Sequence, residues 1–108
     1  MEGVIRSPRN YSGGQPVFEI DIFLEYDDEF PLKDGERIAS KLKIGSEEYI
    51  SGIRYKENVG PWMCPDLRNI YNSNVKLSEV LLKNGFTKNE KIKLEYDKML
   101  NAITIRKL

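Results

Sequence analysis

The chain has 108 residues, the length of one ordinary domain, and 40% of them are hydrophobic, so one core can form without disulfides or metals. Its 17 basic and 17 acidic residues balance, which excludes a strong overall positive field and leaves only a local patch for nucleic-acid binding. The single cysteine excludes an internal disulfide. The first ten residues, MEGVIRSPRN, lack the apolar run of a signal peptide. We therefore expect a soluble, cytoplasmic protein with no membrane-spanning segment.

Residues 1–15 contain many turn formers and few apolar residues, which predicts a loose N-terminal arm before a single domain at 16–108. The next segment, VFEIDIFLEY at 17–26, alternates between apolar and acidic residues and predicts a strand. The segment 27–37, DDEFPLKDGER, contains a proline and an Asp-Gly pair and predicts a loop.

The middle of the chain predicts a hairpin of two strands, at 38–44 and 48–56, that turns near Gly45-Ser46. A short strand over PWMC at 61–64 follows, with Trp62 and Cys64 expected to face the barrel and Met63 to face away. A helix is predicted over 77–85, where leucines are spaced for one face and Gly85 supplies the stop. Two further alternating strands end the chain.

These elements predict a mostly β fold, a small antiparallel open barrel with one main helix before a C-terminal hairpin. The hydrophobic periodicity predicts a core formed by Ile20, Ile22, Leu24, Leu42, Ile44, Ile53, Leu77, Val80, Leu81, Leu94, Tyr96, Ile103 and Ile105.

The residue types needed for common catalysis are scarce. The chain has no histidine, which removes the commonest general base and most zinc sites. Cys64 stands among apolar residues and prolines rather than cations, so we expect a buried, unreactive thiol. No glycine motif for phosphate binding occurs. We therefore expect a non-enzymatic protein with no catalytic residue, metal site or cofactor.

The C-terminal third, KLSEVLLKNGFTKNEKIKLEYDKMLNAITIRKL, combines a leucine-rich helix, a glycine stop, a polar turn and a strand-turn-strand. It resembles the end of the DNA-binding pseudobarrel superfamily, which includes plant auxin-response-type domains and the effector or recognition domains of some restriction endonucleases. The order of elements also resembles the swapped-hairpin barrels of bacterial transition-state regulators. Upstream, KLKIGSEEYISGIRY and GPWMCPDL resemble the hairpin and arm of the restriction-type members. The resemblance spans residues 38–108.

The pseudobarrel resemblance implies a seven-stranded open barrel that grips the major groove of double-stranded DNA with two loop arms, as the recognition part of a restriction or regulatory system. The second arm falls at 54–68, and the nucleic-acid-binding residues that it implies are Arg54, Lys56, Asn58, Trp62 and Arg68. The first arm falls at 27–37, where five acidic residues outnumber Lys33 and Arg37 and depart from a phosphate-binding pattern.

The sequence also allows purely structural roles for these residues, and it leaves one other function open. Arg54 and Lys56 also fit the solvated face of a strand, and Trp62 also fits a core position. The alternative function is a protein-interaction module or small inhibitor that binds a basic partner through the acidic loop. DNA binding predicts cationic residues gathered on one concave face, whereas a basic partner predicts an acidic or apolar patch there.

Overall fold

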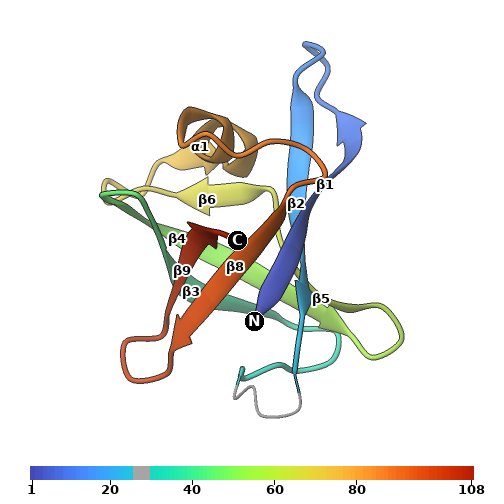
Figure 1. Cartoon of the computed structure of the whole chain (residues 1–108), viewed down its shortest axis with the longest axis vertical. Helices are drawn as coiled ribbons and strands as arrows, with labels where there is room; N and C mark the ends of the chain where they lie inside the picture. The colour runs from blue at the N-terminus through green and yellow to red at the C-terminus, as the bar shows by residue number, and fades with distance from the viewer. Residues whose placement is uncertain (26–29) are drawn as a thin grey trace.

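The computed structural model of the chain describes residues 1–25 and 30–108. The elements of this part are β1 (Glu2–Asn10), β2 (Pro16–Phe23), β3 (Arg37–Ile44), β4 (Glu47–Lys56), β5 (Gly60–Met63), β6 (Asp66–Arg68), β7 (Asn74–Lys76), α1 (Leu77–Lys83), β8 (Lys91–Asp97) and β9 (Ala102–Lys107). The mostly β architecture with one helix in the described ranges confirms the predicted class (Figure 1). Among the same residues, no helix has the length and apolar character needed to cross a bilayer.

Seven strands close into a barrel in the order β3–β9–β8–β1–β2–β5–β4, with β4 returning to β3. The prediction of an open antiparallel barrel is therefore wrong, because this ring is closed and β3 runs parallel to β9, with Leu42 opposite Ile103. Strands in a ring of odd number cannot alternate in direction all the way round, so closure requires a parallel pair. Asn101 supports this seam, since its carbonyl accepts from the Lys41 N–H at 2.9 Å and its side-chain amide donates to the Ala39 carbonyl at 3.1 Å.

Strands β6 and β7 lie outside the ring. β6 pairs with β4 where Arg68 faces Ile50, and β7 pairs with β6. β7 leads directly into α1, whose Leu77, Val80 and Leu81 are buried in the core. The helix thereby covers one end of the barrel, while the β4–β5 loop and the described part of the β2–β3 loop lie at the other end (Figure 1).

The core agrees with the predicted list at most positions. The predicted isoleucines and leucines of β2, β3, β4, α1, β8 and β9 are buried, as is Val80. Leu24 is the wrong prediction, because it follows the end of β2 and is 39% exposed. Tyr96 is half-buried and packs against Phe30 from the β2–β3 loop, with ring centroids 4.6 Å apart. Tyr26, the last residue of the strand predicted at 17–26, lies outside the described residues.

The loose arm expected over residues 1–15 is wrong for Glu2–Asn10, which form β1 in the middle of the sheet. β1 pairs with β2 along its length and with β8 at its start. Gly3 and Ile5 face the interior, and Ile5 is fully buried. The sequence hides this strand because it offers only Val4 and Ile5 as adjacent apolar residues. The exposed turn at 12–15 joins β1 to β2.

A charged group links β4 to the helix. The Glu47 carboxylate accepts hydrogen bonds from the Lys83 ammonium and the Tyr49 hydroxyl. The Lys83 contact and then the Tyr49 contact lower the pKa of Glu47. Burial and then the hydrogen bond to Glu47 raise the pKa of Tyr49 to about 12.

We expect Lys83→Gln to raise the Glu47 pKa toward its ordinary value, because the ammonium that stabilises the carboxylate is removed. A carboxyl whose pKa is lowered by folding stabilises the protein above its unfolded pKa, and this stabilisation is lost as pH falls through the folded pKa. The pair is exposed, so its effect on stability is small and the pKa itself is the better measurement. An NMR titration of the Glu47 carboxyl checks this, with Lys88→Gln as the control. An identical Glu47 pKa in Lys83→Gln would show that the ion pair does not form.

Candidate nucleic-acid interface

The candidate interface is built on the β4–β5 hairpin. Arg54 lies opposite Trp62 and Lys56 lies opposite Gly60, so the two strands bring the cationic and aromatic residues side by side. Gly60 has a φ of 96°, a left-handed conformation that glycine adopts without strain. The Val59 N–H donates to the Lys56 carbonyl at 2.9 Å and closes the turn that carries Asn58.

The buried residues of this hairpin show which side chains point into the barrel and which point outward. Ile53 and Met63 are opposite each other and both fully buried, so Arg54 and Trp62 occupy the outer face of the barrel. The predicted orientation of Trp62 is therefore wrong, because Met63 takes the inward position and Trp62 is half-buried outside. Cys64 is buried, as expected, although it lies past the end of β5. Its N–H donates to the Gly52 carbonyl at 2.8 Å.

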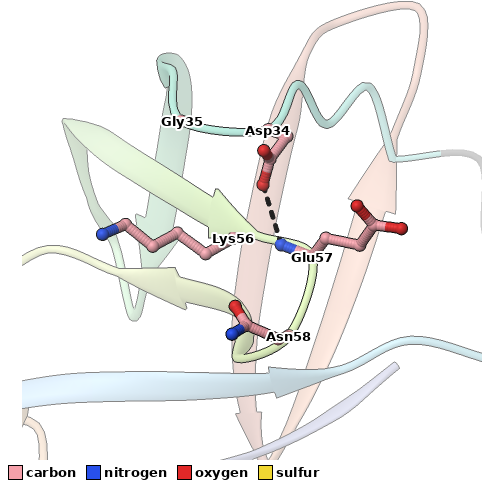
Figure 2. A pocket seen from close by; sticks show the side chains of 5 residues that line it. All are labelled: Asp34, Gly35, Lys56, Glu57 and Asn58. Atoms are coloured by element: carbon pink, nitrogen blue, oxygen red, sulfur yellow. Dashed lines mark hydrogen bonds between the residues drawn. The ribbon is translucent and has the colours of Figure 1, made fainter.

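Two adjoining hollows lie at this end of the barrel. One, of about 390 Å³, is lined by Gly35, Arg54, Tyr55, Lys56, Val59 and Trp62. The other, of about 460 Å³, is lined by Asp34, Gly35, Lys56, Glu57 and Asn58. Figure 2 shows that Lys56 and Glu57 extend to opposite sides of the second hollow. The two hollows share Gly35 and Lys56 in their linings, and together they are called the depression below.

The depression lies where two loops meet, and these loops correspond to the two arms that the resemblance implies. The Asp34 carboxylate accepts from the Glu57 N–H at 2.8 Å (Figure 2), and the Gly35 N–H donates to the Tyr55 carbonyl at 2.9 Å. The β2–β3 loop is thus held against the β4–β5 hairpin. Of the acidic residues in the first arm, Asp34 and Glu36 are exposed, while those at 27–29 lie outside the described residues.

This outer face carries the cations of β3 and β4, and the carboxylates of Asp34 and Glu57 also line the depression. Within residues 1–25 and 30–108, no ion pair involves Arg37, Arg54 or Lys56. Asp21, on the far side of Trp62 from Arg54, is paired with Arg6. The hydrogen bond to Asp21 is the main reason that the pKa of Arg6 is raised. The carboxylate on the β2 side of Trp62 is therefore already paired.

The structure brings four of the five predicted site residues together. Arg54, Lys56, Asn58 and Trp62 all line the depression. Arg68 does not line the depression. It is on β6, where it lies opposite Ile50 of β4, and its guanidinium donates to the Asn72 carbonyl at 3.0 Å.

Arg37 was not among the predicted site residues, yet it lies directly opposite Arg54. The hairpin turn at Gly45-Ser46 contained the signal that identifies it. Counting back equally along both strands from that turn pairs residue 37 with residue 54.

The groups available for recognition on this face are cations, an amide, an aromatic ring and the carboxylates of Asp34 and Glu57. Among the described residues, no group of three or more histidine, cysteine, aspartate or glutamate side chains is placed to hold a metal ion. Comparisons of the chain with protein-family models, with characterised proteins and with solved structures found no match.

Proposed function

We propose that the chain is a non-catalytic module that binds double-stranded DNA through the outer face of β3, β4 and β5. The observation that carries this proposal is the gathering of Arg37, Arg54 and Lys56, without ion-pair partners among the described residues, on neighbouring strands, with the half-buried Trp62 opposite Arg54. Cations of this kind contact phosphates, and arginine and asparagine also read base edges through paired hydrogen bonds.

The contact between the two loops supports the same proposal. In the pseudobarrel resemblance two loop arms act together on one DNA groove, and here the corresponding loops are tied at Asp34–Glu57 and Gly35–Tyr55. A restriction or regulatory system is the setting that this resemblance implies. The overall neutrality of the chain means that the affinity would depend on this local face rather than on net charge.

We expect Arg54→Ala to weaken binding of random-sequence duplex DNA and to reduce its salt dependence. If Arg54 contacts one phosphate, the slope of log K against log salt falls by about 0.9. If it contacts a base edge, the loss is instead roughly 1–3 kcal/mol of discrimination between sequences. Fluorescence anisotropy of a labelled duplex at two salt concentrations measures the first, and a comparison of duplex sequences measures the second.

Lys88→Ala is the matched control, because Lys88 is exposed on the segment between α1 and β8, away from the β4–β5 hairpin. It removes one positive charge and should leave the salt dependence unchanged. Arg68→Ala tests how far the DNA contact extends along β4. It should weaken binding only if the contact continues from Arg54 to the Ile50–Arg68 pair. Absence of binding by the unaltered protein at low salt would reject the proposal.

A second candidate function, binding of a protein partner, has its own observation. Ile70 and Tyr71, on the loop between β6 and β7, are 76% and 81% exposed. They line a hollow of about 460 Å³ beside Glu47 and Glu48. Glu47 is already paired with Lys83, so the exposed apolar groups and the Glu48 carboxylate are what suit a basic protein surface. This candidate takes precedence if the DNA titration shows no binding.

A further inference from the structure

Arg37 and Arg54 are held at directly opposite positions on β3 and β4. Both side chains are exposed, and neither has an ion-pair partner in the part of the chain that the structure describes. Like charges directly opposite one another in an antiparallel pair are destabilising. A bound anion would relieve this repulsion.

Gly52 makes room for the Arg37 side chain. A Cβ atom at Gly52 would lie 2.2 Å from the Cζ, Nε and Nη2 atoms of Arg37. The guanidinium thus occupies the place of a side chain on β4 and reaches across from β3 to the strand that carries Arg54. Any larger residue at position 52 would force Arg37 to move.

We infer that Arg37 and Arg54 bind one phosphate group on the outer face of β3 and β4, with Trp62 on the other side of Arg54. The planar guanidinium fork matches the oxygens of a phosphate, and two such groups supply donors from neighbouring strands. Trp62, on β5, lies opposite Arg54, and these two residues line the same hollow. For its ligand this inference rests on the proposed function, since the phosphate would be a phosphodiester of the DNA backbone. Free phosphate shares the chemistry and serves as the probe.

Titration with inorganic phosphate at constant ionic strength tests the site directly. Trp62 is the only tryptophan in the chain, so its fluorescence reports on this face alone. We expect a saturable change in the unaltered protein. Arg37→Gln and Arg54→Gln should each weaken phosphate binding by roughly tenfold or more, because each removes charge-assisted hydrogen bonds. Lys88→Gln removes the same charge elsewhere and should leave the affinity unchanged.

Gly52→Ala is the sharper variant, because it keeps every charge and changes only the space that Arg37 occupies. We expect it to weaken phosphate binding several-fold. Gly13→Ala is its control, since a Cβ at Gly13 meets no atom within 4 Å. Circular dichroism and thermal unfolding confirm that each variant is folded, and the side-chain Nε–H NMR signals of Arg37 and Arg54 in the unaltered protein give an independent readout.

The outcomes separate this inference from the proposed function. A response that does not saturate, or that is the same in Arg37→Gln and Lys88→Gln, overturns the phosphate site. DNA binding that persists unchanged in Arg37→Gln and Gly52→Ala also overturns it while leaving the proposed function in place. Saturable phosphate binding without any DNA binding supports the site and rejects the proposed function, and it assigns the site to another phosphorylated ligand.

Discussion

Replacing Met63 with alanine is expected to lower the free energy of unfolding by about 2–5 kcal/mol. Met63 is fully buried and lies opposite Ile20 on one side and Ile53 on the other. The substitution removes its apolar surface from the core and leaves a cavity between those two neighbours. Trp62→Ala removes a larger side chain, yet it should cost less, because that side chain is half-buried on the outer face and its loss opens space to solvent.

Chemical denaturation followed by far-UV circular dichroism measures both changes without depending on the tryptophan signal. The fitted slope against denaturant should stay the same, so that the shift in midpoint reports stability. A larger loss for Trp62→Ala than for Met63→Ala would mean that Trp62, not Met63, faces the barrel interior.

This pair of residues also shows what the sequence can and cannot predict about the interface. Period-two alternation correctly predicts that neighbours in PWMC face opposite sides of a strand. It does not tell which side is the interior, because every residue of the stretch is apolar. The face is decided by pairing, since Met63 is in register with Ile20 and Ile53, both fully buried. Because Met63 takes the inward position, Trp62 lies on the outer face opposite Arg54 and is part of the candidate interface.

The predicted elements are most accurate where both partners of a pair are close in sequence. The β3–β4 hairpin has its turn at Gly45-Ser46 as expected, and α1 begins at the predicted Leu77. The parallel pairing of β3 with β9 joins residues about sixty positions apart and is set by the direction of every strand between them. Local periodicity contains no information about such a partner. Alternation along one strand does not show which residue lies across the sheet, so it does not identify Arg37 as the neighbour of Arg54.

β1 illustrates a strand whose sequence pattern is weak because glycine takes an interior position. Gly3 lies in register with Ile22 of β2 and Ile92 of β8, so it is flanked on both sides. A Cβ at this position would lie 2.7 Å from the Asp21 carbonyl oxygen, 3.0 Å from Leu94 Cδ1 and 3.1 Å from Ile20 Cγ2. A residue that looks like part of a flexible terminus is therefore required by close packing.

Gly3→Ala is accordingly expected to lower the free energy of unfolding by about 1–3 kcal/mol. The nearest obstacle is a backbone oxygen on a paired strand, so relief requires the sheet itself to shift. Gly52→Ala also creates a close approach, but there a flexible arginine side chain can move away, and its effect on stability should be smaller. Gly13→Ala, with no atom within 4 Å of the added methyl group, should change stability least. Thermal unfolding of the three variants should place Gly3→Ala lowest, whereas a loose N-terminal arm would give Gly3→Ala and Gly13→Ala the same stability as the unaltered protein.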